Sequence, residues 1–87
     1  MCKLFRLYTF DVNRRAVLRL AADKFEDFTL QPTTGFHRGA PHESLVIELL
    51  QVCEQDVQDL ATSIRELNGQ ASVRVMSLHA DTEKIPQ

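Results

Sequence analysis

Hydrophobic and polar residues follow one of two periods, and segments with the one period alternate along the chain with segments that have the other. In some segments apolar and polar residues alternate one by one, as in a strand, and in others apolar residues recur every three or four positions, as in a helix with one buried stripe. The predicted order is strand, helix, strand, strand, helix, strand. The strands are expected at 4–10, from 28 to 31, at 44–52 and at 72–78, and the helices at 14–27 and 54–68.

Each predicted helix has one apolar stripe and identifiable ends. Asp11 and Asn13 precede the first helix and offer N-cap side chains, and Asn68-Gly69 ends the second as a left-handed C-cap does. The stripe residues are Val17, Leu20, Ala21, Phe25 and Phe28 in the first helix and Val57, Leu60, Ala61, Ile64 and Leu67 in the second. Each helix is therefore expected to pack one side against the sheet.

Right-handed crossovers between these elements predict an α+β, ferredoxin-like βαββαβ fold in one domain spanning residues 1–87. Its four-stranded antiparallel sheet would carry both helices on one face, with the first and third strands central. Pro32 cannot donate to a strand ladder, which places the second strand at an edge or makes it bulge there. The stretch TTGFHRGAPHE, residues 33–43, reads as a mobile hairpin connection, and residues 81–87 as a polar tail.

Two one-sided helices leave the opposite face of the sheet for water, a ligand or a second copy. Arg6 is expected between Glu48 and Arg74 on this face, among apolar neighbours. An apolar patch with paired charges suits the self-complementary surface of a homodimer. A solvated face with weak salt bridges and a ligand-binding face are the alternatives. The face is predicted to carry Arg6, Tyr8, Val46, Glu48, Leu50, Arg74 and Met76.

The hairpin stretch holds a second set of candidates, His37, His42 and Glu43. Two imidazoles and a carboxylate could ligate a transition metal or transfer protons near neutral pH, with Tyr8 nearby. The order HxxxxH followed by Glu matches no standard zinc pattern, and a polar turn with incidental histidines is the simpler interpretation. No cofactor is otherwise expected.

Arg14 and Arg15 lie in the first turn of the first predicted helix, where the helix dipole disfavours cations. An anion or an acidic neighbour is therefore expected at this end of the helix. A weaker functional alternative follows, a small-ligand sensor in which these two arginines hold an anion.

Composition disfavours several classes of partner. The net charge is −2, from ten Lys and Arg against twelve Asp and Glu, which disfavours nucleic acid, and Tyr8 alone would offer a ring for base stacking on the central strands. No apolar stretch approaches the length of a membrane span. Cys2 and Cys53 form no CxxC motif, which favours the cytoplasm and reduced thiols. Cys53 is expected at a strand end as a small apolar filler.

Between residues 28 and 76 the chain resembles small uncharacterised ferredoxin-like proteins of phages, plasmids and bacteria. The segments that carry the resemblance are FTLQPTTGFHRG, HESLVIEL, DVQDLATSIRELNGQ and ASVRV. The resemblance implies the fold and no established activity, and it directs attention to Gly35, Phe36, Gly39 and Glu43.

The leading hypothesis is a small cytoplasmic interaction or regulatory protein that performs no chemistry and acts as a homodimer through its open sheet face. The protein partner, if any beyond itself, has no signature in the sequence. The alternative from another class is a small, metal-assisted hydrolase or isomerase that uses His37, His42 and Glu43.

Overall fold

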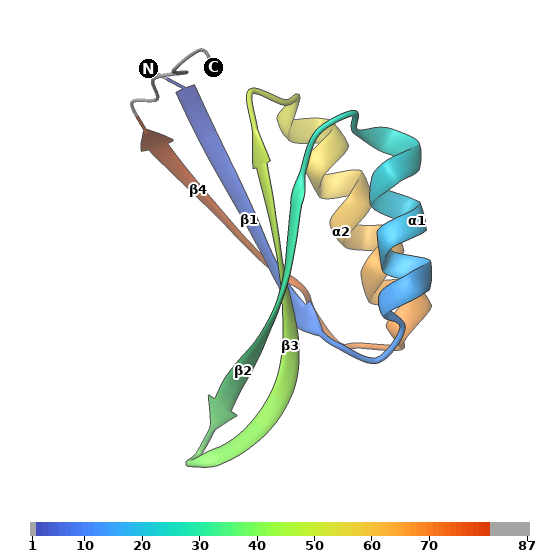
Figure 1. The fold of residues 1–87 in the computed structure, drawn as a ribbon, viewed down its shortest axis with the longest axis vertical. Coiled ribbons are helices and arrows are strands. Elements are labelled where there is room, and N and C mark those ends of the chain that lie inside the picture. Colours follow the sequence, from blue (N-terminus) through green and yellow to red (C-terminus); the bar gives the residue numbers. More distant parts are fainter. Residues whose placement is uncertain (1, 81–87) are drawn as a thin grey trace, which may run out of the picture.

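Four antiparallel strands form one sheet, and two helices pack on one of its faces (Figure 1). The computed structural model describes residues 2–80, and the predicted tail at 81–87 lies outside them. The strand order is β2-β3-β1-β4, which confirms the ferredoxin-like βαββαβ prediction with the first and third strands central. The elements are β1 Cys2–Phe10, α1 Arg14–Lys24, β2 Thr29–His37, β3 Ala40–Leu50, α2 Glu54–Asn68 and β4 Arg74–Ala80.

The core lies between the helices and the sheet, where both predicted helical stripes meet the inner face of the central strands. The buried apolar residues are Phe5, Leu7, Leu45, Ile47 and Leu49 of the sheet, Val17 and Ala21 of α1, Phe25 directly after α1, and Val57, Leu60, Ala61 and Ile64 of α2. Each large aliphatic or aromatic side chain buried here contributes about 1.5–3 kcal/mol. Leu67, the last residue of the predicted second stripe, remains 42% exposed.

The helix ends show which local signals were reliable. Helix α2 begins and ends where predicted, and Gly69 takes the left-handed conformation with φ of 66°. Helix α1 ends at Lys24, three residues before the predicted end, because Phe25 already has an extended backbone. Phe25 and Phe28 still reach the core from the connection to β2. The apolar spacing identified the right residues there but overestimated the helix.

The stretch 33–43 is a hairpin as predicted, but it consists mostly of paired strand, so the predicted strand ends at 31 and 44 are wrong. Strands β2 and β3 stay paired from Thr29↔Glu48 to His37↔Ala40. Only Arg38 and Gly39 turn, with φ of 51° and 81°, the left-handed pair that a two-residue hairpin turn needs. Pro32 lies in β2, an edge strand as predicted. The hairpin extends beyond the helices as an arm (Figure 1).

The position of Cys53 and the character of the two helices bear on two further predictions. Cys53 is an exposed free thiol at the N-cap of α2, so its predicted role as a buried filler is wrong. Within residues 2–80, neither helix has the length and apolar character that crossing a membrane requires.

Candidate functional site: the open sheet face and the hairpin groove

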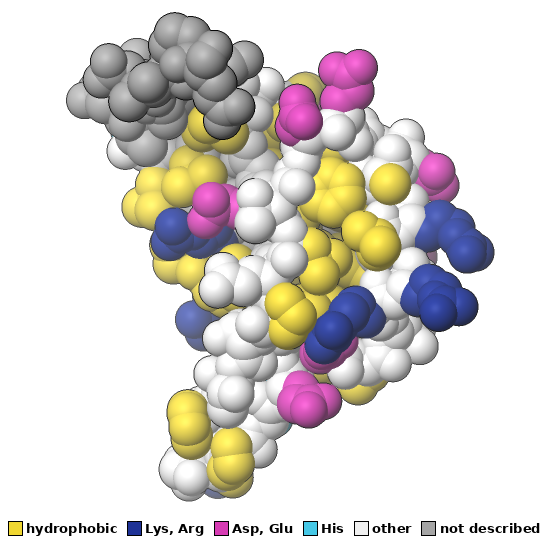
Figure 2. All heavy atoms as spheres, viewed as in Figure 1, with side chains coloured by type: hydrophobic (Ala, Val, Ile, Leu, Met, Phe, Trp, Pro, Cys, Tyr) yellow, Lys and Arg dark blue, Asp and Glu magenta, His cyan; other side chains and the backbone are white. Residues whose placement is uncertain are grey.

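The face of the sheet opposite the helices, here called the open face, is organised in rows across the strands. One row joins Leu50 of β3, Leu4 of β1 and Leu78 of β4. Leu50 and Leu78, on either side of Leu4, are 39% and 42% exposed, so the row forms an exposed apolar patch of the kind that marks interaction surfaces. Figure 2 shows hydrophobic side chains around basic and acidic ones on the side of the molecule formed by β1 and β4. Leu4 and Leu78 extend the predicted patch.

The second row carries the charged pair of the open face. The Arg6 Nε donates a hydrogen bond to Glu48 Oε2 at 2.8 Å. This bond raises the pKa of the Arg6 guanidinium above its usual value, and Tyr8 adds to the shift. The predicted position of Arg6 between Glu48 and Arg74 is only half right, because its partner on β4 is Met76.

The third row contains Val46, Tyr8 and Arg74, with Tyr8 opposite Val46 on one side and Arg74 on the other. All seven residues predicted for the open face therefore share it. The prediction missed the register by one row for Arg74, because β4 begins at Arg74 and pairs two residues further along β1 than assumed. Strand period alone places a residue on a face but does not set its row.

The hairpin histidines do not form the expected cluster with Glu43. His42 pairs with Gly35 and therefore faces the open side, whereas Glu43, its neighbour in the strand, points to the opposite face. Among the described residues, no three His, Cys, Asp or Glu side chains come together in a way that could hold a metal ion. The predicted set of His37, His42 and Glu43 is thus divided between two faces of the arm.

His42 is instead held in place by an aromatic ring and a glycine. Its imidazole meets the Phe10 ring edge-on, with centroids 5.2 Å apart and an interplanar angle of 74°. A side chain at Gly35 would collide with this imidazole, because an added Cβ would lie 2.5 Å from His42 Nε2. Gly35 therefore leaves room for the histidine, which no local sequence signal indicates.

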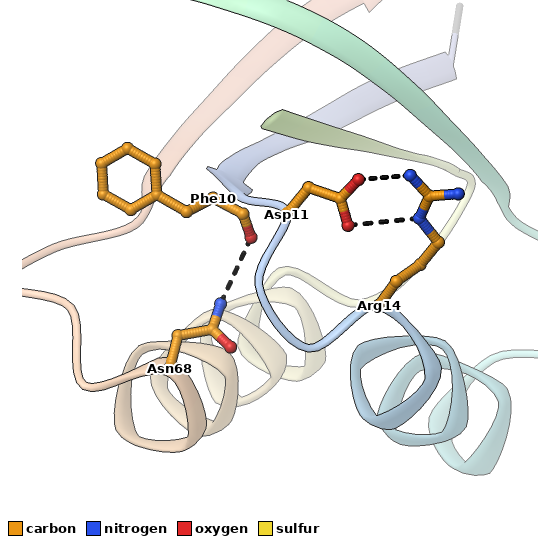
Figure 3. A network of polar contacts seen from close by, with 4 residues as sticks. All are labelled: Phe10, Asp11, Arg14 and Asn68. Atoms are coloured by element: carbon orange, nitrogen blue, oxygen red, sulfur yellow. Dashed lines mark hydrogen bonds and ion pairs between the residues drawn. The ribbon is translucent and has the colours of Figure 1, made fainter. Parts of the chain in front are cut away.

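The expected acidic neighbour of Arg14 is Asp11 at the end of β1 (Figure 3). Arg14 Nε donates to Asp11 Oδ1 at 3.1 Å, and Arg14 Nη2 contacts the second carboxylate oxygen. The side chain of Asp11 is 7% exposed, and the hydrogen bond from Arg14 holds the pKa of its carboxyl below the usual range. Glu43 adds a weaker attraction that raises the pKa of Arg14. Arg14 is thus paired within the chain, which weakens the argument for an anion sensor.

This pair predicts an acid-dependent loss of stability. A carboxyl with a lowered folded-state pKa stabilises the protein above the ordinary aspartate pKa of about 3.9. That contribution disappears as the pH falls through the lowered folded-state pKa. We expect Asp11→Asn to be less stable than the wild type at pH 7 and to show a flatter dependence in acid. Urea unfolding at several values between about pH 7 and 2 measures the free energy of unfolding of both proteins. Asp23→Asn is the control, because Asp23 is an exposed acid of α1.

Polar side chains join the end of α2 to the end of β1. The Asn68 amide donates to Gln70 Oε1 at 2.7 Å and to Thr9 Oγ1 at 3.2 Å. It also reaches the Phe10 carbonyl at 3.5 Å (Figure 3). Asn13 donates to Asn68 Oδ1 at 3.0 Å instead of capping α1 with its side chain. This network places the α2–β4 loop beside Phe10.

A groove of about 730 Å³, here called the hairpin groove, lies where these parts meet. The end of β1, the arm and the α2–β4 loop form its walls. Tyr8, His37, His42 and Arg74 among the predicted candidates line it, and Glu43 does not. Sequence reasoning missed Phe10 and Gln70, because neither belongs to a motif and the fold alone brings them together.

Several solved structures share this fold. A DUF3240 family protein from Shewanella baltica is 15% identical, has a TM-score of 0.71, and is matched over 99% of this chain and 97% of its own. CutA from Synechococcus elongatus, complexed with Bis-Tris, is 12% identical with a TM-score of 0.63, over 91% of this chain and 79% of its own. A nitrogen regulatory PII-like protein from Thiomonas intermedia, bound to ADP, AMP and bicarbonate, is 14% identical with a TM-score of 0.61, over 95% and 96%.

No protein-family model and no curated protein matches the sequence. The structural likenesses confirm the ferredoxin-like fold, and at these identities they show the fold alone. The DUF3240 likeness agrees with the resemblance to small uncharacterised proteins found in the sequence.

Proposed function

We propose that the protein is a small cytoplasmic regulatory or interaction protein that acts as a homodimer through its open face. The observation that carries this proposal is the leucine row of Leu50, Leu4 and Leu78 beside the pair of Arg6 and Glu48. Compact regulatory proteins among the structural neighbours, such as the PII-like protein, are compatible with this role. The exposed free thiol of Cys53 suits a reducing compartment.

The exposed leucines favour a partner that covers the open face with an apolar surface. Burying a row of half-exposed aliphatic side chains against a second such row removes water from both, at about 25 cal/mol for each Å² of apolar surface. A second copy offers a matching row, because a two-fold interface brings the same patch from each subunit together. The open face thus provides its own complement.

The charges on the open face favour a second copy of this chain over an unrelated partner whose surface carries charges of a single sign. Arg6 and Glu48 are side by side, and their side chains are 37% and 39% exposed. A two-fold axis passing near this pair would bring Arg6 of each subunit toward Glu48 of the other. Opposite charges then meet across the interface, and no like charges face each other there. The third row, which contains Tyr8, Val46 and Arg74, borders this interface on its hairpin side.

The test is a charge introduced on the open face. We expect the wild type at tens of micromolar to sediment with twice the chain mass of 9.9 kDa. The Leu50→Glu variant is expected to sediment as a monomer with an unchanged circular dichroism spectrum, because its new carboxylate would be desolvated in the dimer.

The Leu18→Glu variant is the matched control for this experiment. Leu18 is 45% exposed on α1, so the same substitution is made at similar exposure on the helix side. It is expected to leave the sedimentation of the dimer unchanged. A wild-type protein that sediments as a monomer at these concentrations, or equal effects of both variants, contradicts the proposed interface.

A further inference from the structure

The hairpin groove has the size of a small-molecule site. Its volume of about 730 Å³ lies within the roughly 300–1,000 Å³ typical of ligand pockets. It opens at the hairpin-side margin of the open face, beyond the leucine row. Rings and polar groups from three separate parts of the chain converge on it, which is the usual composition of such sites. The side chains that matter here are Tyr8, Phe10, His42, Gln70 and Arg74.

The charge of the groove is opposite to that of the whole chain. None of the described residues that line the groove is acidic, although the chain has a net charge of −2. Arg74 supplies a permanent positive charge, and His37 and His42 add ring nitrogens. Arg74 is the partner of Tyr8 in the pairing of β1 with β4. Such a concave, locally positive site attracts an anion.

The aromatic rings of the hairpin groove favour a planar, aromatic ligand. Phe10 is 46% exposed even with His42 against it, and Tyr8 lies on the same face of β1. Aromatic faces and edges stack well on other planar rings, and this adds specificity to simple burial.

The groove is also held in shape before any ligand arrives. His42 rests on Gly35 and against Phe10, so its ring has little room to turn. The Gln70 amide nitrogen donates to the Ser72 carbonyl at 3.0 Å, and Gln70 Oε1 accepts from Asn68. Walls fixed in this way spare a ligand part of the entropy cost of ordering them.

A second hollow, of about 510 Å³ between α1 and α2, is less suited to an anion. Its lining combines Arg19 with Asp23 and Glu66 and contains no aromatic ring among the described residues. The electrostatic and aromatic features that point to a ligand are therefore specific to the hairpin groove.

We propose that the hairpin groove binds a small planar aromatic molecule that carries an anionic group. The ring system stacks against Tyr8 and Phe10, which lie on the same face of β1 as the partners of Val46 and Ser44, and Arg74 pairs with the anion. Guanidinium groups bind phosphate and carboxylate through paired hydrogen bonds, so both anions fit this site. The inference does not require the proposed dimer, although Tyr8 and Arg74 lie where the groove and the interface adjoin.

The test uses four probes and the full-length chain. Naphthyl phosphate and naphthoate each combine a flat ring system with an anion, whereas naphthol and inorganic phosphate each lack one part. We expect at least one of the two aromatic anions to bind with a Kd about tenfold or more below those of naphthol and phosphate. The tighter of the two identifies the anion. When the probe that binds is added to the protein, the backbone amide NMR signals of Tyr8, Gln70 and Arg74 should shift.

Arg74→Gln is the decisive variant, and Arg65→Gln is its matched control on the exposed side of α2. We expect Arg74→Gln to weaken binding of the aromatic anion about tenfold and to leave naphthol binding unchanged, and Arg65→Gln to change neither. The NMR spectrum of each free variant confirms that it is folded. Equal binding by Arg74→Gln and the wild type, signal changes confined to other surfaces, or no binding at millimolar probe overturns the proposal.

Sedimentation of the same samples separates this proposal from the proposed function. A monomer that binds the aromatic anion contradicts the dimer and supports the groove. A dimer that binds none of the probes supports the interface and contradicts the groove.

Discussion

We expect Ile47→Ala to lower the free energy of unfolding by about 2–4 kcal/mol. Ile47 is fully buried near the middle of β3, where it pairs with Leu7 of β1 and Leu30 of β2. The substitution removes transfer free energy and leaves a cavity that the sheet and both helices cannot close. Such a loss is a large part of the total stability of a small domain, which is about 5–15 kcal/mol. Urea unfolding at equilibrium measures it.

Val46→Ala is the control, because Val46 is the neighbour of Ile47 in β3 and lies on the open face. We expect a loss of less than about 1 kcal/mol when the protein is diluted far enough to be monomeric. The Val46→Ala penalty should grow with protein concentration if the open face joins two copies, whereas the Ile47→Ala penalty should not depend on it. Equal penalties at high dilution would mean that both faces of the sheet are covered within one chain.

We expect Gly35→Ala to destabilise the protein by about 1–3 kcal/mol, the usual cost of overpacking. The added Cβ would lie 2.5 Å from Nε2 and 2.8 Å from Cε1 of His42, and 3.0 Å from Ser44 Oγ. The imidazole must therefore leave its position against Phe10, and the hairpin groove changes shape. Chemical denaturation reports the free energy, and the NMR signals of the His42 ring report the displacement.

Removing the histidine tests whether the collision is the cause. In a His42→Ala background, Gly35→Ala should cost about 0.5–2 kcal/mol less than in the wild type. Gly39→Ala is the matched control, since Gly39 has φ of 81° and no atom within 4 Å of an added Cβ. Its penalty comes from backbone strain and should be the same with or without His42. An unchanged penalty for Gly35→Ala in the His42→Ala background would show that another contact requires the glycine.

Local sequence signals predicted the elements and the buried residues of this protein well. Helix α2 has both predicted ends because its stripe, its acidic first turn and Gly69 all act within a few residues of one another. The seven residues of the open face were predicted for the same reason, since alternation of side chains between faces is built into every strand. Where two local signals disagreed, prediction failed. Gly35, Gly39 and Pro41 indicated a hairpin connection over 33–43, but the pairing of β2 with β3 continues to His37↔Ala40.

The composition of the candidate sites was decided by contacts between distant parts of the chain. Alternation placed Arg6 and Arg74 on one face, but the hydrogen-bonded register of β1 and β4 put Met76 opposite Arg6. The same pairing rules sent Glu43 away from His42, and the α2–β4 loop brought Gln70 to Phe10. A residue's own neighbours in sequence determine its preferred backbone and its face. Its partners across a sheet depend on the free energy of the whole packed core, which no short segment contains.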